Sequence, residues 1–137
     1  MIQSPQIIQV LNGDAVHEAK VSWWREGARW AVDITSQAFE PTAAEAADAF
    51  EALCVVREAL EQRGWRIGVT GAQADVWPSG MARDQGGGLR AYRMTTDGIA
   101  GLVDTFQPVN PTTVVTVAAQ RAETDRLYEE IQHKNQS

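Results

Sequence analysis

Two stretches near the N-terminus alternate between apolar and polar positions with a period of two. The apolar positions are Ala19, Val21 and Trp23 in the first stretch and Trp30, Val32 and Ile34 in the second. This period is typical of strands with one buried face. The link Arg25-Glu26-Gly27 is short and contains glycine, so the two stretches predict a β-hairpin. Because Trp24 follows Trp23 on the same strand, one of the two is expected on the outer face of the sheet.

Residues 42–64 carry the pattern of an amphipathic helix. Thr42 and Glu45 match a capping box at its expected start, and Gly64 lies where a left-handed C-terminal cap is expected. One stripe at helical spacing is apolar and consists of Ala46, Ala49, Phe50, Leu53, Val56 and Leu60. The rest of the surface is acidic, with Glu45, Asp48, Glu51, Glu58 and Glu61 against Arg57 and Arg63. Such a charge run is usually a solvated face and less often a docking surface.

The remaining chain predicts further strands and a second helix. Residues 65–70, 89–95 and 102–106 are expected to form strands, the second lying beside the first, with a turn at Asp97-Gly98 before the third. Residues 71–88 read as one long irregular loop, a kind of segment that is often functional. Asn110-Pro111 is expected to open a helix whose second half is exposed or rests on a partner. The tail 133–137 is expected to fray.

These elements predict one α+β domain over residues 1–137, in the order ββαβββα. Hairpin-length links favour a mainly antiparallel sheet of about five strands, with the two main helices packed on one face. The run Ile7–Leu11, closed by a turn signal at residues 12–14, could add an edge strand or form a short helix.

Composition and charge exclude several classes of protein. The chain of 137 residues has 18 acidic and 12 basic residues, a formal charge of −6. This balance disfavours nucleic acids and anionic membranes as partners, and it suits a basic protein partner. No secretory signal or membrane-spanning stretch is visible, so a cytoplasmic location is expected. The single cysteine excludes an internal disulfide.

The residues that could carry chemistry do not form a recognisable catalytic set. Cys54 reads as a buried structural thiol, Ser79 lacks a nucleophile elbow, and His17 and His133 have no metal partner at useful spacing. The run Gly86-Gly87-Gly88 lacks the pattern of a phosphate loop and reads as a flexible connection. The sequence therefore predicts a non-catalytic protein with no cofactor and no metal. The competing hypothesis is a small hydrolase or transferase that uses Asp75, Arg83, Asp84 and Tyr92 around the long loop.

The segment 75–92 is also a candidate interface. Trp77, Arg83, Asp84 and Tyr92 lie in it, and Trp, Tyr and Arg dominate interface hot spots. The structural alternative has equal weight: Arg83 pairs with a carboxylate and fixes the loop, while Trp77 packs beneath it.

The stretch RGWRIGVTGAQADVWPSGMARDQGGGLRAY resembles small uncharacterised bacterial proteins. The resemblance rests on Asp75-Val76-Trp77-Pro78-Ser79-Gly80-Met81-Ala82 and on a Gly-x-x-Ala-Tyr run ending at Tyr92, covers residues 63–92 and implies no reaction. In size, charge and class the chain is also similar to immunity proteins, which neutralise toxin domains of contact-dependent growth inhibition and other interbacterial systems.

The sequence therefore predicts an immunity-type protein, monomeric or weakly dimeric, that binds a cognate toxin, and its acidic charge favours a basic one. The acidic residues Glu45, Asp48, Glu51 and Glu58 are expected to steer association. Trp77 and Arg83, with the exposed one of Trp23 and Trp24, are expected to supply anchors that slow dissociation. Asp84 and Tyr92 complete the predicted partner-binding residues. A secretion chaperone, which needs a dimerising surface, is a third alternative.

Overall fold

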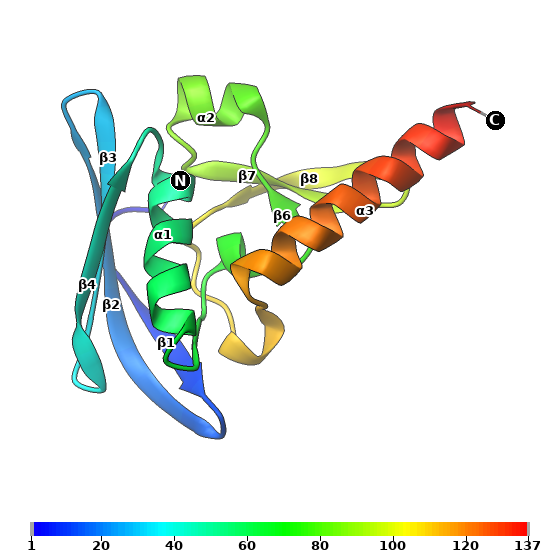
Figure 1. The fold of residues 1–137 in the computed structure, drawn as a ribbon. Coiled ribbons are helices and arrows are strands. Elements are labelled where there is room, and N and C mark those ends of the chain that lie inside the picture. Colours follow the sequence, from blue (N-terminus) through cyan, green and yellow to red (C-terminus); the bar gives the residue numbers. More distant parts are fainter. Residues whose placement is uncertain (1, 137) are drawn as a thin grey trace.

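The computed structural model describes residues 2–136 and has a mixed α+β fold with antiparallel sheets (Figure 1). The strands are β1 (Gln6–Asn12), β2 (Ala15–Glu26), β3 (Arg29–Ser36), β4 (Phe39–Ala46), β5 (Trp65–Ile67), β6 (Val76–Trp77), β7 (Arg90–Thr95) and β8 (Gly98–Asp104). The helices are α1 (Ala49–Glu61), α2 (Gly80–Gly86) and α3 (Val117–Gln136), with 3-10 turns η1 (Thr70–Ala72) and η2 (Pro111–Thr113). The predicted fold class is confirmed.

The larger sheet has five strands in the order β4-β3-β2-β1-β5. Its first four strands follow one another through tight turns, and the predicted hairpin is β2–β3, with Trp23 opposite Val32. The run Ile7–Leu11 belongs to β1, which lies between β2 and β5 and so is neither a helix nor an edge strand. The inward positions Ala19, Val21, Trp23, Val32 and Ile34 are buried, as the period of two requires, and Trp30 near the start of β3 is partly buried against the core.

The predicted start of the long helix is wrong. Thr42 and Glu45 belong to β4, where they pair with Ile34 and Ala31. Helix α1 begins only at Ala49, and the Asp48 side chain caps it by accepting a 2.8 Å hydrogen bond from the Glu51 amide. Thr42 and Asp48 are each followed three residues later by a glutamate, so both match a capping signature. Residues 39–46 instead form backbone hydrogen bonds with β3 and extend the hairpin by one strand. Gln62 caps the other end, and Gly64, with φ of 92°, follows in the turn.

Helix α1 covers one face of the five-stranded sheet (Figure 1). The predicted apolar stripe is buried throughout, and Ala46 contributes from the end of β4. Trp23 points into this core and stacks on Phe106 with ring centroids 4.2 Å apart, whereas Trp24 is 43% exposed. One of the two adjacent tryptophans therefore lies on the outer face, as predicted.

Residues 71–88 do not form an irregular loop. They contain η1, β6 and α2, which is capped by Ser79 and ends at Gly87 in the left-handed conformation. Strand β7 then pairs with β6 and β8 in a separate three-stranded sheet, not with β5 as expected. The order of elements is therefore β1-β2-β3-β4-α1-β5-β6-α2-β7-β8-α3. Residues 71–88 form short elements because a buried irregular loop would leave backbone groups without hydrogen bonds.

Gly87 and Gly88 are closely packed, so the glycine run is not a flexible connection. A Cβ atom on Gly88, where φ is 72°, would lie 2.8 Å from the Asp48 Oδ1 and from the Phe50 nitrogen. A Cβ atom on Gly87 would meet the Trp30 indole at 2.6 Å. Glycine is required at positions 87 and 88 because the backbone there is left-handed and because neighbouring atoms leave no room for a Cβ atom.

The C-terminal helix starts later than predicted. Asn110 caps the turn η2 through the Thr112 amide, and α3 begins at Val117. The first half of α3 packs against α1 and the smaller sheet, and its second half runs along the β7–β8 hairpin, where Lys134 lies 2.9 Å from Asp97 (Figure 1). Residues 133–136, expected to fray, belong to α3, and Ser137 lies outside the described residues. No helix in the described part of the chain is long and apolar enough to span a bilayer.

Candidate partner-binding site

Four of the residues predicted to bind a partner converge on one cluster, which we call the Arg83 cluster. The Arg83 guanidinium lies 3.2 Å from Asp48 Oδ2 and 3.3 Å from Glu51 Oε2. Its carbon atom Cζ also lies 5.6 Å from the centre of the Trp77 ring and 5.3 Å from that of Phe50. The cluster joins α2 to the N-terminus of α1 and to β6.

Within the Arg83 cluster, the charged side chains pair with one another: Arg83 pairs with Asp48 and Glu51. Arg83 is only 23% exposed on its side chain, and Asp48 also caps α1. The Trp77 ring packs edge-on against Phe50 at 5.2 Å. These contacts have the form of the structural alternative for Arg83 and Trp77, since the arginine pairs with carboxylates and the tryptophan packs beside it.

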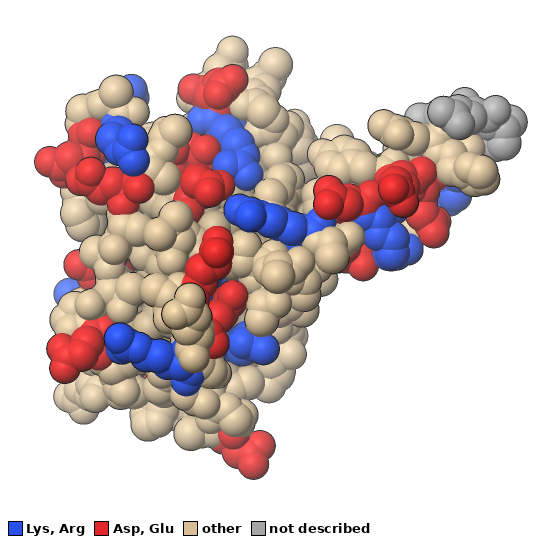
Figure 2. Space-filling view, viewed as in Figure 1, with Lys and Arg blue, Asp and Glu red and all other residues tan. Residues whose placement is uncertain are grey.

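The other predicted residues lie apart from this cluster. Glu45 is exposed on β4, Glu58 is exposed near the far end of α1, and Asp84 is exposed on α2. The acidic residues predicted for one helix surface are therefore divided between two elements, and two of them are paired. Figure 2 shows basic and acidic side chains interleaved over the face that carries α1, α2 and α3.

Tyr92 lines a groove between α2 and the smaller sheet, here called the α2 groove. Its volume is about 360 Å³, and the residues that line it are Ser79, Met81, Ala82, Gln85, Gly86, Leu89, Arg90, Tyr92 and Leu102. Met81 and Leu102 are 68% and 48% exposed. The groove is mostly apolar, and Arg90 on its rim lies 3.5 Å from the Asp104 carboxylate.

The residues of the competing enzyme hypothesis are held in different places. Asp75 accepts a 2.8 Å hydrogen bond from Arg93, which also donates to Gln73. Arg83 belongs to its own cluster and Asp84 is exposed, so Tyr92 alone of the four lines the α2 groove. The four side chains thus have separate contacts.

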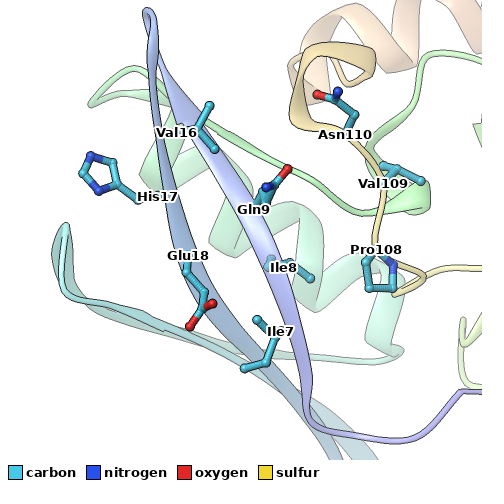
Figure 3. Close-up of a pocket in the computed structure, with 9 residues that line it drawn as sticks. All are labelled: Ile7, Ile8, Gln9, Val16, His17, Glu18, Pro108, Val109 and Asn110. Carbon is cyan, nitrogen blue, oxygen red and sulfur yellow. The ribbon is translucent and has the colours of Figure 1, made fainter.

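A larger hollow of about 500 Å³ lies beside β1, β2 and residues 108–110 (Figure 3). His17 and Glu18 are its titratable residues. Because they are consecutive on a strand, their side chains leave opposite faces of the sheet. His17 packs against the edge of the Trp65 ring with centroids 5.7 Å apart.

Cys54 lies fully buried on α1. Burial raises the pKa of its thiol to about 11. A thiol with this pKa is protonated at neutral pH, which agrees with the structural role predicted from the sequence. Across residues 2–136, no group of three or more His, Cys, Asp or Glu side chains could hold a metal ion.

The face of β1–β4 turned away from α1, here called the outer face, was a candidate only through Glu45 and the exposed one of Trp23 and Trp24. No helix covers it in the described part of the chain (Figure 1). The strand registers place on it the exposed apolar residues Ile7, Val16 and Trp24. Within residues 2–136 its charged residues are four acids and two bases: Glu18, Glu26, Asp33, Glu45, Lys20 and Arg29. The signal was present in the sequence, since these residues occupy the positions between the buried ones.

These features define a small acidic α+β protein with an uncovered sheet face, an apolar groove and a charged cluster that fixes α2. No protein-family model matches the chain, and no curated protein matches its sequence.

Proposed function

We propose that this chain is a bacterial immunity-type protein that binds a basic toxin domain in the cytoplasm and blocks it without catalysis. The observation that carries the proposal is the placement of unpaired acidic charge. Residues 2–46 hold six carboxylates and three basic side chains, a net charge of −3, which is half of the −6 of the whole chain.

None of these six carboxylates has an ion pair within the described residues, whereas eight of the twelve carboxylates in residues 47–136 do. Unpaired charge on a partly apolar surface supports association with a basic protein, because it steers encounter while apolar contacts slow dissociation. A toxin that attacks nucleic acid needs a basic cleft for phosphates, and an acidic sheet face suits such a cleft.

This proposal moves the steering charges from α1 to the outer face. On α1, Asp48 and Glu51 already pair with Arg83, so they contribute little free charge to a partner. The carboxylates of Glu18 and Asp33 have no such partner in the described structure and lie on the uncovered side of β2 and β3.

The experiment uses the product of any toxin-domain gene that lies beside the gene of this chain. Co-expression is expected to protect cells from that toxin, and the purified pair is expected to associate more slowly as salt is raised. The double variant Glu18→Lys with Asp33→Lys should slow association by about tenfold, as expected for steered encounter. Glu58→Lys, an exposed control on α1, should change it much less.

Absence of both protection and binding would refute the proposal. A secretion chaperone would instead behave as a dimer that binds an exported protein, and a small enzyme would turn over a substrate in a manner sensitive to Asp84→Asn. Size-exclusion chromatography and an activity assay on the same preparation separate these alternatives.

A further inference from the structure

We propose that Trp24, with the carboxylates of Glu26 and Glu45, is a recognition site for an arginine or lysine side chain of a protein partner. The inference rests on the proposed function in that it supplies the contact through which a basic partner is held. It names a surface that sequence analysis left undefined, because only the register of the strands brings these residues together.

The Trp24 indole is both exposed and fixed. The residue is 43% exposed, and its ring nitrogen donates a 2.7 Å hydrogen bond to Glu26 Oε2. Residues 24 and 26 of one strand share a face, so this bond holds the ring along the outer face of β2. An aromatic side chain held in one orientation loses little conformational entropy when a partner binds, which favours its use as an anchor.

Glu45 lies in the same cross-strand row as Trp24. Trp24 is opposite Ala31 on β3, and Ala31 is opposite Glu45 on β4. Ala31 is only 5% exposed, although no helix covers this face within residues 2–136. Its methyl group is therefore covered by side chains of the sheet itself, of which Trp24 is the largest directly opposite neighbour.

The charge around the ring favours a cation. Glu26, Asp33 and Glu45 lie on this part of the outer face with two bases. Lys20 lies one residue pair beyond Asp33 on this face, and the Arg29 guanidinium donates to the main-chain oxygen of Glu45 at 3.2 Å. No salt bridge within the described residues neutralises these three carboxylates. An aromatic face beside carboxylates attracts guanidinium and ammonium groups through both the ring quadrupole and the charges.

The molecule already contains this combination once, occupied by its own arginine. In the Arg83 cluster, two aromatic rings and two carboxylates surround one guanidinium. The surface at Trp24 offers an aromatic ring and two carboxylates, and the described structure places no cation over that ring. The same chemistry is therefore open to an arginine or lysine supplied by another protein.

The test uses a defined cationic probe, an acetylated and amidated peptide of ten arginines. The matched control peptide has citrulline at every position, which keeps the shape of the side chain and removes its charge. Binding is followed by the NMR signals of the five tryptophan ring N–H groups and of the backbone amides of residues 22–33. We expect the arginine peptide to shift the Trp24 ring signal saturably and the citrulline peptide to leave it unchanged.

Two pairs of variants locate the site. Trp24→Leu should raise the Kd for the arginine peptide about threefold to fivefold, the range of an exposed cation–π contact, while Tyr128→Leu on α3 should not. Glu45→Gln should weaken binding more than Glu58→Gln, which removes the same charge from α1. Unchanged backbone spectra away from the mutation show that each variant is folded.

Equal effects of Glu45→Gln and Glu58→Gln would overturn the inference, because the peptide would then respond to overall charge. A dimer that Trp24→Leu converts to a monomer would also overturn it, since a second copy would occupy the face. If the peptide binds at Trp24 but the neighbouring toxin does not bind, the proposed function fails and the cation site stands. If this chain binds the toxin and protects cells while the peptide leaves the Trp24 signal unchanged, the proposed function stands and the cation site fails.

Discussion

Arg57 of α1 and Gln120 of α3 share a buried hydrogen bond between residues 63 positions apart in the sequence. Both side chains are fully buried, and Arg57 also donates to the Val115 carbonyl oxygen at 2.8 Å. The Gln120 amide in turn donates to the carbonyl oxygens of Gly71 and Val76, each at 2.7 Å. One polar network therefore joins α1 and α3 to η1 and to β6 of the smaller sheet.

The ion pair of this network costs desolvation. Burial lowers the pKa of Arg57 and raises that of Glu61, whose carboxylate lies 3.7 Å away and accepts the first amide of α3. Buried charges persist only when their remaining hydrogen-bonding groups are satisfied. The stability of the junction therefore depends on the uncharged member, Gln120, as much as on the charges.

Replacing Gln120 with leucine should destabilise the protein by about 3–5 kcal/mol, because the buried arginine and two carbonyl oxygens lose a partner. Urea unfolding followed by tryptophan fluorescence measures the change. Gln132→Leu, an exposed position on the same helix, should change the free energy of unfolding by less than about 0.5 kcal/mol. Equal effects of the two variants would show that the network contributes little.

Gly88→Ala tests the close packing of the glycine run. The added Cβ atom would lie 2.8 Å from Asp48 Oδ1 and would occupy left-handed backbone, so a loss of about 2–4 kcal/mol is expected. At Gly86 a Cβ atom meets nothing within 4 Å, and Gly86→Ala should be neutral or stabilising by about 0.5 kcal/mol. Thermal unfolding compares the two, and a tolerant Gly88 would support the flexible connection predicted from sequence.

Asp48→Ala and Thr42→Ala distinguish the observed cap of α1 from the one predicted by the sequence. Asp48→Ala removes the hydrogen bond to the Glu51 amide and an ion pair with Arg83, so it should cost about 1–3 kcal/mol. Thr42 lies on β4, and its hydroxyl contacts the Glu40 carbonyl oxygen at an exposed site, so Thr42→Ala should cost less than about 0.5 kcal/mol. A reversed order in urea unfolding would contradict the observed start of the helix.

Thr42 and Asp48 show which part of the fold the sequence could not predict, namely the start of α1. The alternation around Trp23 and Trp30 identified the hairpin, since a period of two is a local property. The choice between Thr42 and Asp48 is not local: Thr42–Ala46 becomes a strand because β3 offers a ladder, and tertiary pairing overrides the capping signal.

The candidate site was limited in the same way. The sequence identified Arg83 and Trp77 as candidate anchors, but the carboxylates that pair with Arg83, Asp48 and Glu51, lie more than thirty positions from it. The four residues meet only because α2 folds back onto α1. Charge reversal of Asp48 and Glu51 would consequently break the Arg83 cluster, which makes it a poor test of steering.

Cys54 should be unreactive in the folded protein. With its pKa raised by burial to about 11, the thiolate at pH 8 is about a hundredfold rarer than in an unfolded chain, and the sulfur is buried. Iodoacetamide should therefore modify it at least a hundredfold more slowly in buffer than in urea.

In the folded protein the pKa of the Cys54 thiol lies above the ordinary value of 9.0. The stability linked to the thiol proton is therefore present below pH 9 and is lost as pH rises through about 11. Fast alkylation of the native protein would contradict the burial.

Arg83→Met should loosen α2 while leaving the rest of the fold in place. The guanidinium provides both the ion pairs to α1 and the contacts with the Phe50 and Trp77 rings, whereas methionine keeps only part of the apolar contact. Hydrogen exchange should therefore become at least tenfold faster at the amides of residues 82–88 and remain unchanged in the middle of α1.

Arg126→Met is the matched control, because Arg126 pairs with Glu123 and Glu130 on its own helix. Since α2 also forms one wall of the α2 groove, the signals of Met81 and Leu102 should broaden in the first variant and not in the second. Unchanged protection in Arg83→Met would mean that the Ser79 cap and the glycine packing are sufficient to hold α2.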